Sequence, residues 1–509
     1  MTDRMIYLDD RGVDREIVLA NGRKAATGLA SLGVGEGDCV ALLLRNDFVF
    51  FEAQRAAAAL GAYSIPINWH GAPEEILYVL KDARSKTLVA HADLLAAVRH
   101  VLPEDLVVLV AETPTEIARA YKLTQGQCGI SLGDIAWDQW LSGFEPWAGA
   151  PKLARATMIY TSGTTGNPKG VQRAPATPEQ AAAYVQMIAR VYGLTPGVRA
   201  LVAGPLYHAS PNAYGRQALP TADVLVMQLK FDAEAALALI ERHRITNAVM
   251  APTMFIRMLK LPREVRGRYD VSSLNWVTHT GAPCPAEVKR QLMEWWGPVI
   301  YETYGGTEVG TATLATPQDA MSHPGSVGAP TPGTKIAFYA EDGRLLPLGE
   351  AGEIYMRVPA YADFTYLNDP GKRERVERDG LISVGDVGYL EDGHLYLCDR
   401  RSDMVISAGT NIYPAEIENA LVQCPGVQDC AVFGIPHEEF GESLAAAVEP
   451  VPGADISAEK IREFLGLHIA KFKIPKRIDF HDTLPRHDSG KIFKRKLREP
   501  FWQGAGGTI

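Results

Sequence analysis

One stretch, YTSGTTGNPKG at residues 160–170, constrains the fold and chemistry of this chain more than any other. Its hydroxyl groups supply hydrogen-bond donors, and its glycines let successive backbone N–H groups converge on an anion. Lys169 adds a positive charge that suits a phosphate. A flexible surface loop is the alternative for such a composition. The order of the residues favours an anion-binding loop.

The residues before this stretch and the spacing of its glycines limit the kinds of loop that it can form. The apolar segment 156–160 before it predicts a short buried strand, so we expect the loop to leave the edge of a sheet. The P-loop of nucleoside triphosphatases is excluded, because Gly166 comes only three residues after Gly163 and Lys169 is followed by Gly170. We therefore expect an anion-binding loop of another kind.

The first third of the chain predicts a parallel sheet. Short apolar runs at 39–44, 62–67, 87–90 and 106–110 read as strands, and helical patterns lie at 24–32, 48–60 and 74–80. Alternation of strand and helix implies right-handed crossovers and a mainly parallel sheet. Sheets of this kind bind ligands at the carboxyl ends of their strands. We expect this region to act as a scaffold without chemistry of its own.

Length, charge and cysteine content set the class of protein. A chain of 509 residues predicts two or more domains, and its net charge of −9 argues against nucleic acid as a partner. Residues 1–10 lack the pattern of a secretory signal, and no apolar run is long enough for a transmembrane segment. The six cysteines show no metal-binding spacing. We expect reduced thiols and a cytoplasmic location; the oligomeric state, a homodimer included, is left open.

Four further motifs follow the loop in a fixed order. They are YETYGGTE at 301–308, SVGDVG at 383–388, DRRSD at 399–403 and LPRHDSGK at 484–491. Together with the loop at 160–170, this series resembles the adenylate-forming superfamily, which includes acyl-CoA synthetases, adenylation domains of peptide synthetases and firefly-type luciferases. The resemblance covers nearly the full length of the chain. It implies ATP, Mg²⁺ and coenzyme A as cofactor and co-substrates.

The resemblance implies an ATP and AMP site with defined roles. Tyr304 would stack on adenine, Thr307 would contact the α-phosphate, Glu308 would bind Mg²⁺, and Lys491 would be the catalytic lysine. Taken alone, residues 304–308 could instead be a turn that opens a helix with Thr307 as N-cap. The implied nucleotide-binding residues are Thr161, Ser162, Gly163, Thr164, Thr165, Gly166, Lys169, Gly281, Ala282, Pro283, Tyr304, Thr307, Asp386 and Arg400.

An acid pocket and a coenzyme A side are implied in the same way. His208 would close the acid pocket beside the carboxylate, which places it among the catalytic residues, although a structural histidine is the alternative. The implied acid pocket comprises Tyr207, His208, Asn212, Thr253 and Gly305. Ordinary core packing is the alternative for the segment around Thr253. The implied coenzyme A side comprises Ser407, Ala408, Gly409, Lys471 and Lys473. For the two lysines a solvated basic face is the alternative.

The expected fold is α/β with two domains. Residues 1–400 would form a large adenylation domain of mainly parallel sheets and helices with a β subdomain. Residues 401–509 would form a small, mobile α+β lid domain that carries Lys491. Ser402 occupies the pivot position of the family, where Asp or Lys is more usual.

The expected activity is that of an AMP-forming acid–CoA ligase. A carboxylic acid would become an acyl-adenylate and then a coenzyme A thioester, with AMP and pyrophosphate released. We expect a medium-to-long aliphatic acid or an aryl or alicyclic acid, since 207–215 holds no Lys or Arg. The alternatives are loading of a carrier protein, a luciferase-like oxygenase and a non-catalytic acid- or nucleotide-binding sensor. The basic carboxyl-terminal surface and the lack of an appended carrier domain favour coenzyme A.

Overall fold

The computed structural model describes residues 4–150, 152–153, 155–161, 168–282, 284–400, 403–407, 410–437, 441–486 and 492–503. The chain forms two compact units. Unit 1 comprises residues 1–322, 331–334 and 357–377, and unit 2 comprises residues 323–330, 335–356 and 378–509. The expected division between residues 400 and 401 concerns domain motion and stays a prediction. Within the described part of the chain, no helix has the length and apolar character needed to cross a bilayer.

The parallel sheet predicted for the first third is confirmed. Its strands run in the order β4-β3-β5-β6-β7, and all four neighbouring pairs are parallel. Every residue of β3 and β5 is buried, as continuous apolar runs predict. The strands are β3 (Cys39–Leu43), β4 (Tyr63–Pro66), β5 (Thr87–His91), β6 (Val107–Ala111) and β7 (Ile135–Ala136).

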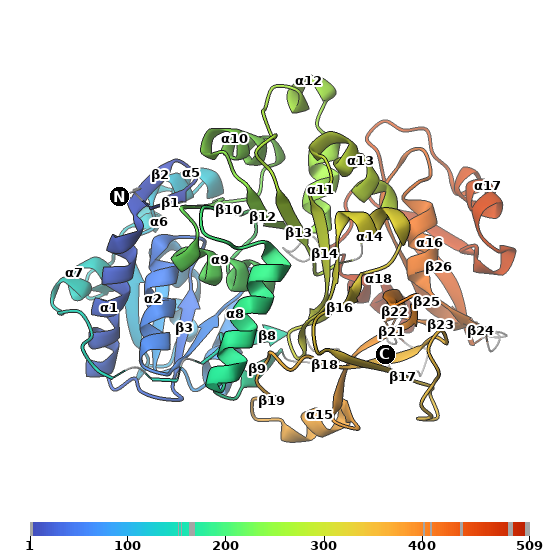
Figure 1. Ribbon diagram of the computed structural model, residues 1–509. Coiled ribbons are helices and arrows are strands. Elements are labelled where there is room, and N and C mark those ends of the chain that lie inside the picture. Colours follow the sequence, from blue (N-terminus) through green and yellow to red (C-terminus); the bar gives the residue numbers. More distant parts are fainter. Residues whose placement is uncertain are drawn as a thin grey trace. The chain divides into compact units, whose positions relative to one another are not determined.

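Helices surround this sheet. Asp14 and Asp47 cap the first turns of α1 and α2, and these two helices pack side by side (Figure 1). The helices of this region are α1 (Arg15–Ser31), α2 (Phe48–Ala59), α3 (Pro73–Asp82), α4 (Ala92–Val98), the 3₁₀ turn η1 (Arg99–Val101), α5 (Thr115–Tyr121), α6 (Gln125–Cys128) and α7 (Trp137–Ser142).

A second, larger sheet forms the centre of unit 1. Its strands there run in the order β15-β14-β13-β12-β10-β11-β1-β2, parallel from β14 to β1 and antiparallel at both ends. They are β1 (Met5–Leu8), β2 (Arg11–Asp14), β10 (Arg199–Val202), β11 (Val224–Met227), β12 (Asn247–Met250), β13 (Trp276–His279), β14 (Ile300–Gly306) and β15 (Gly310–Ala315).

One apolar cluster joins this sheet to helices α10, α11 and α13, with Phe255 and Trp296 among its largest members. The helices of this region are α8 (Pro178–Tyr192), α9 (Ala209–Thr221), α10 (Ala233–His243), α11 (Pro252–Leu259), α12 (Arg263–Arg266), α13 (Ala286–Trp296) and α14 (Pro317–Ser322).

The signature loop departs from expectation in its surroundings. It does not leave the edge of the parallel sheet but joins two antiparallel strands, β8 (Ile159–Thr161) and β9 (Lys169–Arg173). A third strand, β19 (Phe364–Tyr366), pairs antiparallel with β9 and completes a three-stranded sheet. The short helix α15 (Pro370–Arg375) follows β19. A polar strand such as β9, KGVQR, carries little apolar signal, which explains why the sequence did not reveal the hairpin.

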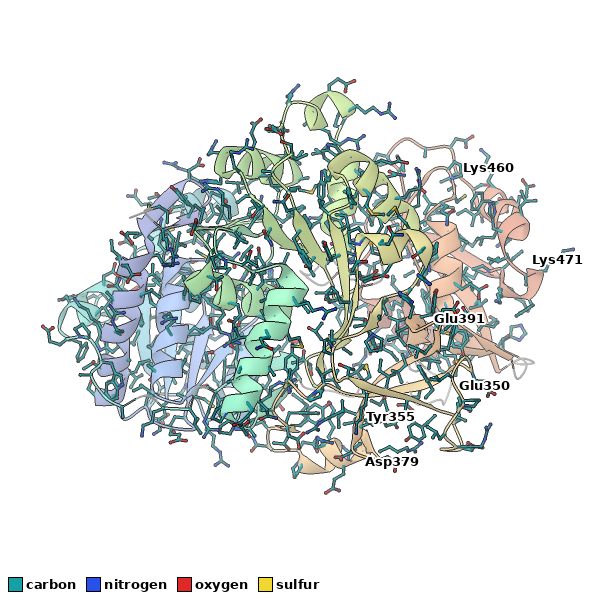
Figure 2. The ribbon with its side chains drawn as sticks, in the orientation of Figure 1. Glu350, Tyr355, Asp379, Glu391, Lys460 and Lys471 are labelled. Atoms are coloured by element: carbon teal, nitrogen blue, oxygen red, sulfur yellow. The ribbon has the colours of Figure 1, made fainter. Side chains whose placement is uncertain are left out.

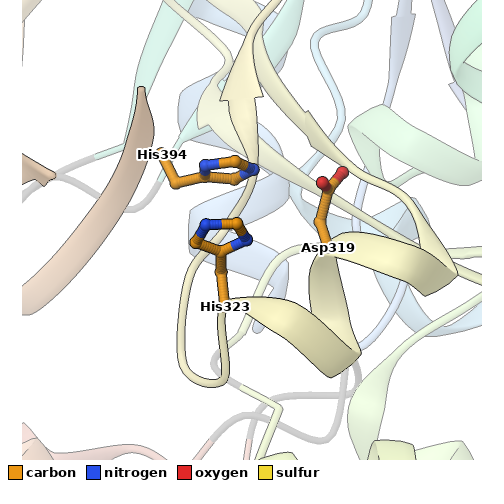
Figure 3. Close-up of side chains that lie close together, drawn as sticks. All are labelled: Asp319, His323 and His394. Atoms are coloured by element: carbon orange, nitrogen blue, oxygen red, sulfur yellow. The ribbon is translucent and has the colours of Figure 1, made fainter. Parts of the chain in front are cut away.

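Unit 2 contains the predicted β subdomain and the predicted α+β region. In the first sheet β17 (Lys335–Tyr339) lies beside β18 (Gly352–Arg357), β18 beside β21 (Leu381–Glu391), and β21 beside β22 (His394–Arg400). The rings of His323 and His394 stack with centroids 3.8 Å apart (Figure 3). The short strands β16 (Ala329–Pro330) and β20 (Glu377–Arg378) complete the strands before residue 400.

The carboxyl-terminal sheet has the order β24-β23-β26-β25, with β27 parallel to β26. An apolar cluster that includes Ile417, Leu421, Ile461 and Leu465 packs α16 and α17 on this sheet. The elements are β23 (Val405–Ser407), β24 (Thr410–Ile412), α16 (Pro414–Leu421), β25 (Val427–His437), β26 (Gly441–Pro450), α17 (Ala458–His468), η2 (Lys471–Lys473), β27 (Arg477–Phe480) and α18 (Lys494–Trp502).

Candidate active site

Four predicted site segments follow four neighbouring parallel strands of unit 1. His208 comes after β10, Thr253 after β12 and Gly281 after β13, while Tyr304 lies near the end of β14. Since the carboxyl ends of parallel strands lie at one edge of a sheet, the fold brings these segments to the same edge. Residues predicted to contact the acid and the adenine therefore share one side of the central sheet.

His208 lies at the junction between strand and helix that the sequence predicted. Its backbone is extended and forms the N-cap position of α9, with φ −83° and ψ 148°. Its ring packs against that of Tyr207, with centroids 4.3 Å apart, and the Tyr207 ring meets Trp69 edge-on at 6.0 Å. Tyr207 is buried and His208 half-buried. An aromatic wall thus stands beside His208.

Asn212, one turn into α9, is buried and hydrogen-bonded inside unit 1. Its Nδ2 donates to the carbonyl oxygen of Leu206 at 2.9 Å. Its Oδ1 accepts from Gln54 Nε2 at 2.9 Å and from Thr157 Oγ1 at 3.1 Å. These bonds join α2, the segment before β8 and α9. Asn212 therefore holds α9 in place, and its contact with the acid stays a prediction.

The YETYGGTE motif forms a hairpin rather than a turn that opens a helix. Residues 300–306 pair with 310–315 as β14 and β15, and the register shifts between Tyr304 and Gly305. At Gly305 the two strands approach so closely that a Cβ would lie 1.9 Å from the carbonyl oxygen of Gly310. Tyr304 is 9% exposed. The hairpin projects Thr307 and Glu308 at its tip.

Arg173 fixes this hairpin tip, and the sequence did not reveal it. From β9, its Nη2 donates to the carbonyl oxygens of Thr307 at 2.7 Å and Glu308 at 2.9 Å. Its Nη1 donates to the carbonyl oxygen of Ala362 at 2.7 Å, and its guanidinium lies over the Tyr361 ring. Burial lowers the pKa of Arg173, but a guanidinium stays charged.

Glu308 is oriented by a second unpredicted residue, Tyr366 on β19. The Tyr366 hydroxyl donates to Glu308 Oε1 at 2.9 Å. Burial, and after it the charge of Glu308, raises the pKa of Tyr366, so this hydroxyl keeps its proton and remains a donor. Among the described residues, Oε2 of Glu308 has no hydrogen-bond partner. A half-buried carboxylate held by one oxygen, with the other available, fits a hard cation such as Mg²⁺.

The two ends of the signature loop are held together. Thr161 and Lys169 are cross-strand partners, and Thr161 Oγ1 donates to the Lys169 carbonyl oxygen at 3.5 Å. Lys169 Nζ lies 3.7 Å from Asp369 Oδ2. In the segment predicted to contact adenine, Gly281 has φ +86° and is exposed, and Ala282 is half-buried. Thr280 beside them donates to the Thr303 carbonyl oxygen at 2.9 Å.

A buried charge network joins β13, α13 and the hairpin strand β14. Lys289 Nζ on α13 lies 2.6 Å from Glu302 Oε2 on β14. His279, the last residue of β13, has its Nε2 3.7 Å from the same oxygen and is fully buried. Burial lowers the pKa of His279 to about 4, so the imidazole is neutral near pH 7. The network links the end of β13 to the first half of β14 and to α13.

Unit 2 carries the other predicted residues. Asp386 on β21 is 9% exposed and is the cross-strand partner of Arg400 on β22, so these two predicted nucleotide-binding residues occupy opposite positions in the sheet. Ser407 ends β23. Lys473 Nζ binds Glu416 at 2.7 Å. Lys471 is exposed, and its side chain projects at the margin of the view in Figure 2.

Several predicted residues lie outside the described residues. They are Ser162, Gly163, Thr164, Thr165, Gly166, Pro283, Ser402, Ala408, Gly409 and Lys491. Their roles stay predictions. The sequence did not predict a role for Arg173 or Tyr366, because each residue contacts a partner that is distant in sequence. No local motif indicates such a pair. The local indication for Arg173 is its position in β9, the strand that follows the signature loop.

Comparison with known proteins identifies the family. The chain is 31% identical over 490 residues to a feruloyl-CoA synthase from Amycolatopsis sp, covering 94% of this chain and 92% of that protein. It is 29% identical to the fatty acid–[acyl-carrier-protein] ligase ScoC from Streptomyces coeruleorubidus, covering 98% and 94%. The solved structure of o-succinylbenzoate CoA synthetase (MenE) from Bacillus subtilis with an acyl-adenylate intermediate is 27% identical, with a TM-score of 0.79 and coverage of 97% and 95%.

Sequence models of two domains match the same chain. The model of the AMP-binding enzyme matches residues 18–363, and that of the AMP-binding enzyme C-terminal domain matches residues 416–491. The first match spans most of unit 1, including the signature loop, the hairpin and the sheet edge. The chain therefore belongs to the AMP-binding enzyme family.

Proposed function

We propose that this enzyme is an AMP-forming acid–CoA ligase. In the first step a carboxylate oxygen attacks the α-phosphorus of ATP, an acyl-adenylate forms, and pyrophosphate leaves. In the second step the thiol of coenzyme A loses its proton and attacks the acyl carbon, a thioester forms, and AMP leaves. Such a route is needed because a free carboxylate is a poor electrophile, whereas AMP is a good leaving group.

The observation that carries this proposal is the common edge of β10, β12, β13 and β14. At this edge His208, Thr253, Gly281 and Tyr304 come together, in a chain that matches the AMP-binding enzyme over residues 18–363. An acid and an adenine could thus bind on neighbouring strands. Phosphoryl transfer depends mainly on positioning and charge neutralisation, which such an edge can supply.

The proposed roles follow the residues one by one. Glu308 would hold Mg²⁺, which neutralises phosphate charge when bound, and Thr307 and Lys169 would contact phosphate oxygens. Tyr304 would lie against adenine, Asp386 would bind the ribose, and Arg400 would bind the ribose or a phosphate. Lys491 would stabilise the adenylation transition state, and Ser402 would be the pivot that exchanges the two half-reactions. Ser407, Lys471 and Lys473 would lie on the coenzyme A side.

We propose an aryl, alicyclic or medium-to-long aliphatic acid as substrate. The aromatic wall of Tyr207 and Trp69 beside His208 favours an apolar body. Arg216, the first arginine after His208, is held by Tyr184, to whose hydroxyl it donates at 3.0 Å. The similarity to a feruloyl-CoA synthase supports an aryl acid, and that to ScoC supports a fatty acid.

The test is pyrophosphate release over a panel of aryl, alicyclic and C6–C18 fatty acids, with ATP, Mg²⁺ and free coenzyme A. We expect release with a restricted set of acids and stoichiometric thioester by mass spectrometry. Pyrophosphate release without thioester, rescued by a carrier protein, would instead support the carrier-loading function that the ScoC relative suggests. No release with any acid would contradict both. ATP as a co-substrate also favours the cytoplasmic location that we propose.

A further inference from the structure

Lys372 is the cation beside the proposed metal site that no motif accounts for. It lies in α15, and its Nζ sits 4.2 Å from the centroid of the Tyr366 ring. The hydroxyl of the same ring donates to Glu308 Oε1. Tyr366 therefore touches the proposed magnesium ligand with its hydroxyl and the Lys372 ammonium with its face.

The side chain of Lys372 has no ion-pair partner within the described part of the chain. Its backbone N–H is the group that bonds Asp369, at 3.1 Å from Oδ1. The Asp369 carboxylate is shared by two other cations, Lys169 at 3.7 Å and Arg375 at 3.7 Å. A half-buried ammonium on an aromatic face, with its carboxylate neighbour engaged elsewhere, is placed for an external anion.

The local charge count points to the same conclusion. Three cations, Lys169, Lys372 and Arg375, lie around two carboxylates, Glu308 and Asp369. Burial lowers the pKa of Lys372, while Glu308 and Asp369 oppose this shift. If Glu308 binds Mg²⁺, its charge no longer offsets Lys372, and the surplus positive charge increases. A polyanion is the ligand that such a surplus suits.

We propose that Lys372 is a catalytic residue that binds the β- and γ-phosphates of ATP and the pyrophosphate that leaves. This inference rests on the proposed function. Two lysines would neutralise the charge of the leaving pyrophosphate: Lys169, at the end of the signature loop on β9, and Lys372 on helix α15. Both residues contact Asp369, Lys169 through its side chain and Lys372 through its backbone N–H. In the thioester-forming step pyrophosphate has already departed, so Lys372 has no role there.

The experiment compares wild type with Lys372→Ala and Lys372→Arg. Calorimetric titration with magnesium pyrophosphate should show ~10-fold or greater weakening in Lys372→Ala, and partial recovery in Lys372→Arg, because only the charge is restored. The Michaelis constant for ATP in acid-dependent ATP–pyrophosphate exchange should rise similarly. Thioester formation from a supplied acyl-adenylate of the best panel acid should be unchanged.

A matched control is Lys335→Ala, which removes the same charge from an exposed position on β17. It should bind pyrophosphate as wild type does. Wild-type binding of magnesium pyrophosphate by Lys372→Ala would overturn the inference, as would equal loss of both half-reactions. The titration is independent of turnover: if wild type activated no acid, the proposed function would fail, while the pyrophosphate titration would still decide the role of Lys372.

Discussion

Arg173 donates from Nη2 to the carbonyl oxygen of Thr307 across 2.7 Å, although 134 positions of sequence separate the two residues. This bond joins the strand that follows the signature loop to the hairpin tip that carries Glu308. One buried guanidinium thus holds the strand after the signature loop against the hairpin tip with the proposed metal ligand.

The first prediction concerns this guanidinium. Arg173→Lys keeps the charge but cannot serve the carbonyl oxygens of Thr307, Glu308 and Ala362 with one ammonium group. We expect the free energy of unfolding to fall by ~2–4 kcal/mol, since hydrogen bonds to charged groups are among the stronger ones. Exchange of ATP and pyrophosphate should fall by up to ~10²-fold, because the hairpin tip is displaced.

Urea denaturation and the exchange assay measure the two effects. Arg190→Lys, at an exposed position on α8, is the control and should change neither quantity. An Arg173→Lys enzyme as stable and as active as this control would contradict the role of the guanidinium.

The second prediction concerns the orientation of Glu308. Tyr366→Phe keeps the ring beneath Lys372 but removes the hydroxyl that holds Glu308 Oε1. We expect the Mg²⁺ concentration for half-maximal adenylation to rise by about 10-fold, as for other groups that orient a metal ligand. Saturating Mg²⁺ should restore most of the rate.

Glu308→Gln, which removes the charge itself, should not be rescued in this way. Tyr339→Phe is the matched control, since the Tyr339 hydroxyl also donates to a carboxylate, Oδ2 of Asp379, at 2.6 Å. A rate loss in Tyr366→Phe that is independent of Mg²⁺ would refute the orienting role.

The third prediction separates the half-reactions. Lys491→Ala should slow adenylation by ~10²–10³, the usual effect of removing one transition-state contact. Thioester formation from a supplied acyl-adenylate should persist. Pyrophosphate release and thioester assays on the two half-reactions provide the measurement, and an equal loss in both would assign Lys491 another role.

The fourth prediction is a pH dependence of stability. Burial lowers the pKa of His279 from 6.5 to about 4, so between these values the unfolded chain binds a proton that the folded chain does not. The stability contributed by neutral His279 is therefore complete above pH 6.5 and is lost as the pH falls towards 4, by ~3 kcal/mol in total. His279→Gln should remove this dependence.

The measurement is the difference in unfolding free energy between wild type and His279→Gln at pH 7 and pH 4.5. Glu52 changes the stability with pH in the opposite direction, because burial raises the pKa of its carboxyl to about 7. Both proteins contain Glu52, so its contribution cancels in the difference. His100→Gln, at an exposed position, should show no such difference. A difference that does not vary with pH would contradict the buried neutral imidazole.

The sequence predicted the buried strands well and the polar hairpin poorly, for the same reason. Strand β3 is apolar at every position because both of its faces are covered, and this signal is local. Strand β9 mixes buried residues with the half-buried polar residues Lys169 and Gln172 and shows no strict alternation. It pairs with β19, almost two hundred positions later in the chain. Pairing over such a distance leaves no local pattern.

The residues of the candidate site also divide into those within a local motif and those with long-range contacts. Tyr304, Thr307 and Glu308 were predicted because they form a contiguous motif. Tyr366 acts on Glu308 from 58 positions away, and nothing near it in sequence announces the contact. Sequence motifs indicate the residues that would contact the substrates. The residues that orient those side chains can be identified only from the folded structure.

The close approach at Gly305 limits which positions of the proposed acid pocket can be varied. A methyl group there would collide with a backbone carbonyl at 1.9 Å, and a backbone atom cannot rotate away as a side chain can. Saturation libraries should therefore leave position 305 fixed. His208 and Thr253 are better positions for substitution, because neither lies in a paired strand. His208 is the N-cap residue of α9, and Thr253 lies in the first turn of α11. We expect natural variants with new substrates to have changed positions 208 and 253 and to have kept glycine at position 305.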